Sequence, residues 1–108
     1  MELTNNAQSK FLEYFHREGY SEYDAIENIM RDGQPFDAFR TLPDNMKYGV
    51  YQLFANEQGV QMYVSPLGND WGYSVITKKE GFRGNKTGSI EFAMNENVKK
   101  LNEILNEL

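Results

Sequence analysis

Residues 48–79 constrain the fold more than any other part of this 108-residue chain. They include the single Trp and four of the seven Tyr residues. Apolar and polar residues alternate over 49–55, 60–65 and 71–78, and Gly-containing turns separate these three runs. Alternation with a period of two is typical of half-buried strands. The short connections predict an antiparallel meander, because parallel neighbours need a longer crossover.

The N-terminal third shows helical rather than alternating spacing. Apolar residues recur three to four positions apart over 5–18, and Gly19 is suited to end that helix. We predict a second helix over 21–32 and a short helical turn over 36–41. These elements form a helical unit before the sheet.

The C-terminal residues fit two patterns. Residues 89–94 alternate like a fourth strand, but apolar residues at helical spacing also run through them, namely Ile90, Met94, Val98, Leu101, Leu105 and Leu108. We favour a strand over 89–94 and an amphipathic helix over 96–107, because Asn95 is a good N-cap. It stays open whether 89–94 is a strand or the start of the helix, so three or four strands are expected. The prediction is one α+β domain, 1–108, with the C-terminal helix packed on the sheet.

The composition excludes several classes of protein. The absence of Cys rules out thiol catalysis, Cys-ligated zinc and a disulfide scaffold. No secretory signal is visible, and no apolar run approaches the roughly 18 residues that a membrane span needs. We therefore expect a cytoplasmic protein with no membrane partner. No cofactor, metal or catalytic motif is recognised, and the only histidine, His16, lies near the end of a predicted helix.

Acidic side chains are concentrated in the predicted helical unit. The net charge is −5, and residues 13–44 carry eight acidic side chains against three basic ones. A surface of this kind can attract a basic partner. The predicted partner-binding acidic face comprises Glu18, Glu22, Asp24, Glu27, Asp32 and Asp37.

The segment 78–88 is the basic counterpart, and we predict it to be a polar, Gly-rich loop. It supplies the candidate nucleic-acid contacts Lys78, Lys79, Phe82, Arg83 and Lys86. Lysine and arginine can contact phosphates while an aromatic ring stacks on a base. The other interpretation is a solvated hairpin tip whose lysines oppose edge-to-edge pairing.

Aromatic residues of the predicted sheet form a third candidate contact surface. Tyr and Trp are enriched at binding hot spots, and the candidates here are Tyr51, Tyr63, Trp71 and Tyr73. The competing interpretation is packing in the core and between strands.

The leading hypothesis is a small acidic, non-enzymatic interaction module that binds another protein. One form of it is an inhibitor or regulator encoded by a phage or mobile element and directed at a nucleic-acid-handling protein. A nucleic-acid-binding protein acting through 78–88 is the alternative. A small enzyme or ligand binder with a carboxylate and tyrosine cleft is the second alternative. Which surface binds, what it binds and the oligomeric state all stay open.

Overall fold

The computed structural model describes residues 1–18 and 39–107, with the backbone alone for residues 85–87. The described part contains α1 (Asn5–Arg17), α4 (Asp44–Glu57), β1 (Gln61–Leu67), β2 (Asp70–Ile76), β3 (Gly81–Thr87) and α5 (Ile90–Asn106). The predicted helix 21–32 lies outside it. So does the first half of the predicted helical turn 36–41, and of its second half Phe39 and Arg40 are helical. No described helix is long and apolar enough to cross a membrane.

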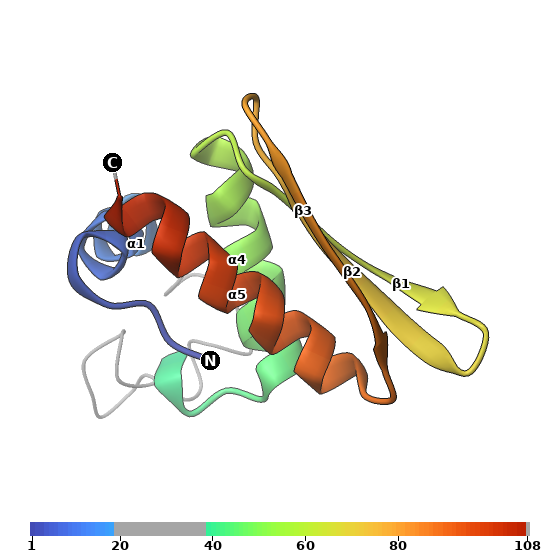
Figure 1. Cartoon of the computed structure of the whole chain (residues 1–108). Coiled ribbons are helices and arrows are strands. Elements are labelled where there is room, and N and C mark those ends of the chain that lie inside the picture. The colour runs from blue at the N-terminus through green and yellow to red at the C-terminus, as the bar shows by residue number, and fades with distance from the viewer. Residues whose placement is uncertain (19–38, 108) are drawn as a thin grey trace.

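The described elements form two layers and confirm the predicted α+β class. The three strands make an antiparallel meander in the order β1-β2-β3. The helices α1, α4 and α5 all lie on the same side of this sheet (Figure 1). Helix α5 packs on β2, and α4 packs against β1. The tip of the β1–β2 hairpin extends beyond the helices, as Figure 1 shows.

The prediction of a strand over 49–55 is wrong, because these residues belong to α4. Its buried side chains Tyr48, Tyr51, Phe54 and Ala55 recur three to four positions apart, which is the helical period. Alternation over seven residues was too short a signal to separate the two periods. Gly59, which looked like part of a hairpin loop, ends the helix with a φ of 80°. The amides of Gly59 and Val60 donate to the carbonyls of Asn56 and Ala55, in the pattern of a Schellman cap.

The strands predicted over 60–65 and 71–78 are confirmed as β1 and β2, with shifted ends. The turn expected at 66–70 is shorter than predicted, because Pro66 and Leu67 belong to β1. Pro66 is tolerated there since β1 is an edge strand. A two-residue turn, Gly68 and Asn69, joins the strands, and Gly68 supplies the required positive φ of 65°.

The prediction of a loop over 78–88 is wrong for most of its length, because β3 spans Gly81–Thr87. Its glycines and charges suggested a loop, but pairing with β2 outweighs its low strand propensity. Only 77–80 form a tight turn, in which Thr77 Oγ1 accepts from the amides of Lys79 and Glu80 at 3.3 and 3.1 Å.

The structure decides the open question at 89–94 in favour of the helix. Helix α5 begins at Ile90, so the favoured strand over 89–94 and the helix start at residue 96 are wrong. Ser89 is the N-cap, and its Oγ accepts from the amide of Phe92 at 3.2 Å. Of the apolar residues at helical spacing, Met94, Val98, Leu101 and Leu105 are buried in the core.

The core is built around Phe11 of α1, which is 1% exposed. Its ring centroid lies 4.8 Å from that of Tyr51, 5.2 Å from Phe39 and 5.3 Å from Phe54. Rings at these distances add favourable edge and offset contacts to the burial of their area. Truncation of a buried Phe to Ala typically costs 3–5 kcal/mol, so this cluster is a main source of stability.

The N-terminus of helix α1 is capped by side chains of α5. Thr4, its N-cap residue, makes no side-chain cap bond within the helix. Instead Asn106 Oδ1 of α5 accepts from the amide of Ala7 at 2.9 Å, and Asn102 Oδ1 accepts from the amide of Thr4 at 2.8 Å. Two asparagines of α5 therefore satisfy amides that a helix N-terminus leaves without partners.

Candidate interaction surface

The alternation of β1 and β2 gives the sheet an inner face toward the helices and an outer face. Met62 and Val75, which are paired in register, are each 1% exposed and lie on the inner face. Tyr63 and Ser74 form the next pair along and point to the outer face. No described helix covers this outer face (Figure 1).

The outer face is hollowed into an open depression of about 500 Å³. Its walls include Tyr63, Ser65, Leu67, Ser74, Ile76 and Arg83. Tyr63 is 47% and Leu67 48% exposed, which is high for large apolar side chains. Leu67 lies across Gly72, where a β-carbon would come within 2.7 Å of Leu67 Cδ1. The glycine thus allows the leucine to fold over its neighbouring strand.

Arg83 is the one charged residue that lines this depression. It lies on β3 opposite Ser74, and its side chain is exposed. Within the part of the chain that the structure describes, its guanidinium forms no ion pair. An unpaired guanidinium beside apolar side chains offers planar donors to a carboxylate.

Amide side chains border the depression along the edge of β1. A neighbouring hollow of about 430 Å³ is lined by Gln52, Asn56 and Gln61. Tyr63 Oη donates to Gln61 Oε1 at 2.7 Å, which orients the tyrosine ring. Gln52 Nε2 donates to the carbonyl of Met62 at 2.9 Å and so occupies part of the strand edge. The surface therefore has an apolar centre and a polar border.

The predicted acidic face is described at one position only. Glu18 is exposed at the end of α1, and its Oε1 lies 3.3 Å from Arg17 Nε. Arg17 also pairs with Glu57 of α4. The other members, Glu22, Asp24, Glu27, Asp32 and Asp37, lie outside the described residues.

The predicted nucleic-acid contacts do not share one surface. Lys78 and Lys79 are exposed on the β2–β3 turn, whereas Arg83 faces outward from β3. Phe82 points to the inner face, where Lys100 Nζ lies 3.7 Å from the centroid of its ring. The side chain of Lys86 is not described. Phe82 and Arg83 therefore lie on opposite sides of the sheet.

The predicted aromatic contacts also lie on different parts of the molecule. Tyr51 is 2% exposed in the helical core, so its expected place on the sheet is wrong. Tyr63 is exposed on the outer face, and Trp71 and Tyr73 are half-buried on the inner-face side of β2. Sequence reasoning missed Leu67, because it was assigned to a turn. It also missed Asn97, whose burial no sequence pattern indicated.

The described side chains give little support for metal or acid–base chemistry. No three His, Asp or Glu residues among those described converge on a point where a metal could bind. His16 is exposed in the last turn of α1, where its edge packs on Phe15 with ring centroids 6.0 Å apart. No family model matches the chain, and no curated protein or solved structure matches it either.

Proposed function

We propose that this protein is a non-enzymatic interaction module that binds another protein through the outer face of its sheet. The observation that carries the proposal is the uncovered depression that is lined by the exposed Tyr63 and Leu67 of β1 and by Arg83 of β3. Tyr and Arg are the residue types most enriched at hot spots, and apolar centres with polar borders are typical of interfaces.

The chemistry of the surface defines the kind of partner. An apolar side chain of the partner would fill the depression and contact Tyr63, Leu67 and Ile76. Arg83, the single charge there, calls for a carboxylate beside that apolar group, since a buried guanidinium without a partner would weaken binding. The partner is therefore a protein with an apolar ridge next to an Asp or Glu.

A nucleic-acid partner has less support. Backbone recognition needs several cations along one track, whereas Arg83 is the one cation that lines the depression and Lys78 lines only the neighbouring hollow. The hypothesis of an inhibitor directed at a nucleic-acid-handling protein depends on the predicted acidic face. Apart from Glu18, the members of that face lie outside the described residues, so that form stays a prediction.

The test is affinity capture from extracts of the source cell, with full-length variants as bait. Tyr63→Ala and Arg83→Ala each remove one feature of the depression. Phe92→Ala and Arg40→Ala are matched controls on the helical layer, and Phe92 is 50% exposed. We expect a partner that wild type and controls retain and that Tyr63→Ala and Arg83→Ala bind at least tenfold more weakly, a loss of about 1.4 kcal/mol.

Two results would contradict the proposal. One is that wild-type bait retains no protein at low salt. The other is that every retained protein binds Tyr63→Ala and Arg83→Ala as tightly as wild type. Thermal melting of all four variants separates lost binding from lost folding.

A further inference from the structure

The outer face of the sheet carries one charge of each sign. Asp70 of β2 and Arg83 of β3 are the only charged residues among the described side chains of the three strands. Arg83 pairs in register with Ser74, and Asp70 lies four residues before Ser74, so alternation puts both charges on the outer face. Both side chains are exposed, and neither forms an ion pair within residues 1–18 and 39–107.

An exposed leucine lies directly opposite this aspartate. Leu67 pairs in register with Asp70 across the hairpin turn, and residues that oppose each other in an antiparallel pair share one face of the sheet. Leu67 is 48% exposed. The chain therefore carries the combination that its own outer face requires of a partner, namely an apolar side chain beside a carboxylate.

The spacing of these groups suits a two-fold axis. Asp70 and Ser74 each lie two residues from Gly72 on β2, so an axis through Gly72 and perpendicular to the sheet exchanges their positions. Asp70 of a second copy would then lie above Ser74, next to Arg83. Stacked sheets lie ~10 Å apart and neighbouring strands ~4.8 Å apart, a separation that an arginine and an aspartate pointing toward each other can span. Symmetry forms this ion pair twice in one dimer.

The shape of the outer face permits such an approach. The described helices all lie on the other side of the sheet, and the hairpin tip extends beyond them (Figure 1). Leu67 Cδ1 lies over Gly72, within 2.7 Å of the position of a β-carbon there. The leucines of two copies would therefore meet at the axis and remove each other from water.

We propose that a second copy of this chain binds the outer face, in a two-fold symmetric dimer with two ion pairs between Arg83 of one copy and Asp70 of the other. This inference rests on the proposed function, because it names the partner of the same surface. A different partner would have to bring its own carboxylate, and Asp70 would be left without a cation.

The size of the face sets the expected affinity. Three strands of seven residues span roughly 23 by 14 Å, or about 300 Å² in projection. That area is well below the ~800 Å² per partner of a standard interface, so the dimer is weak. We expect a Kd on the order of 100 µM, which rises with salt because the two ion pairs are screened.

The first measurement is sedimentation equilibrium of the full-length protein between about 10 µM and 1 mM. We expect a reversible change from monomer to dimer over this range. NMR spectra at the same concentrations should show shifts at Leu67, Gly72, Ser74 and Arg83 and little change on the helices. A wild-type protein that stays monomeric at the highest concentration, or shifts confined to the helices, would overturn the proposal.

Charge reversal tests the reciprocal ion pair. Arg83→Glu leaves the face with two negative charges and Asp70→Arg leaves it with two positive ones, so each variant alone should dimerise at least tenfold more weakly. An equimolar mixture of the two variants brings opposite charges together at both positions. We expect the mixture to associate about as tightly as wild type does. Failure of the mixture to recover, with both variants folded by circular dichroism, would exclude the pairing.

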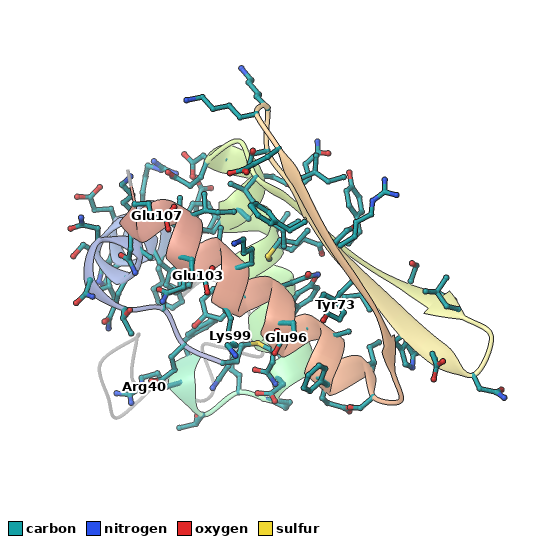
Figure 2. All side chains as sticks on the ribbon, in the orientation of Figure 1. Arg40, Tyr73, Glu96, Lys99, Glu103 and Glu107 are labelled. Carbon is teal, nitrogen blue, oxygen red and sulfur yellow. The ribbon has the colours of Figure 1, made fainter. Side chains whose placement is uncertain are left out.

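The matched controls are charge reversals on the helical layer, Arg40→Glu and Glu107→Arg. Figure 2 shows both residues away from the strands, at the end of the molecule opposite the hairpin tip. They should dimerise as wild type does, and equal weakening by the controls would show an effect of net charge alone. A monomeric wild type that still captures a different protein through Tyr63 and Arg83 would overturn the dimer and leave the proposed function standing.

Discussion

The ring of Tyr73 occupies the space that a β-carbon on Gly84 would need. A β-carbon built there would lie 2.1 Å from Tyr73 Cζ, far inside van der Waals contact. The two residues face each other across β2 and β3, so Gly84 is required for packing rather than for a turn.

Gly84→Ala should therefore destabilise the protein by about 1–3 kcal/mol, because the tyrosine ring has to leave its site. Gly81→Ala is the control on the same strand, since a β-carbon there has no neighbour within 4 Å. Urea unfolding measures the free energy of unfolding of both variants. Adding Tyr73→Ala should recover part of the Gly84→Ala loss. Equal stability of the two single variants would show that the ring does not need the space.

Removal of Asn106 should loosen the start of α1. Asn106→Ala deprives the amide of Ala7 of its acceptor, and a lost cap typically costs about 1 kcal/mol. Hydrogen exchange should show the largest loss of protection at Ala7. Asn95→Ala is the control, because Asn95 bonds to Glu91 within its own helix. Unchanged protection of the Ala7 amide against hydrogen exchange would show that Asn106 does not cap α1.

Tyr51 should make the protein sensitive to alkali. Burial raises the pKa of Tyr51 far above its ordinary value of 10.0, with a smaller rise from Glu2 that Arg40 offsets. The unfolded chain then loses this proton first. The stability linked to Tyr51 is complete below pH 10 and falls by up to about 1.4 kcal/mol per unit above it.

Tyr51→Phe should accordingly lose less stability than wild type between pH 10 and pH 11.5. Burial also raises the pKa of Tyr48, which the bond from Asn97 partly offsets, so Tyr48→Phe should act in the same direction. Urea midpoints measured at half-unit intervals of pH test this. Parallel curves for wild type and Tyr51→Phe would exclude the linkage.

Ser89→Ala should shorten α5 and raise the pKa of Glu91 in its first turn. The loss of the bond to the Phe92 amide should cost about 1 kcal/mol. A bond to its own backbone, and then the bond from Ser89, lower the pKa of Glu91, so the variant should raise that pKa toward 4.5. The stability linked to this acid is present at neutral pH and is lost as pH falls through the folded-state pKa.

An NMR titration of Glu91 and urea unfolding at pH 7 measure the two effects of Ser89→Ala. Ser65→Ala, an exposed position on β1, is the control and should stay within about 0.5 kcal/mol of wild type. An unchanged Glu91 pKa in Ser89→Ala would argue against the bond between the two side chains.

Local sequence signals were sufficient where one pattern dominated. The spacing of Phe11 and Phe15 predicted α1, and alternation in β1 and β2 predicted both strands. They failed at α4, where Tyr51 and Phe54 fit both periods over a short window. They also failed at β3, whose two glycines have poor strand propensity and depend on pairing with β2.

The candidate surfaces were harder to predict than the fold. Exposure of Tyr63 follows from alternation, but the position of Leu67 across the neighbouring strand depends on Gly72 lying beside it. The burial of Asn97 depends on where Tyr48 and the carbonyl of Tyr63 lie in space. These relationships join distant residues, which no local pattern encodes.

The asparagines that cap α1 also bear on how the protein is synthesised. Helix α1 leaves the ribosome first, yet Asn102, which bonds to Thr4, follows 98 residues later. Until translation has passed Asn106, the amides of Thr4 and Ala7 lack the side-chain acceptors that they have in the folded protein. The nascent chain therefore completes the capping of α1 only after the synthesis of α5.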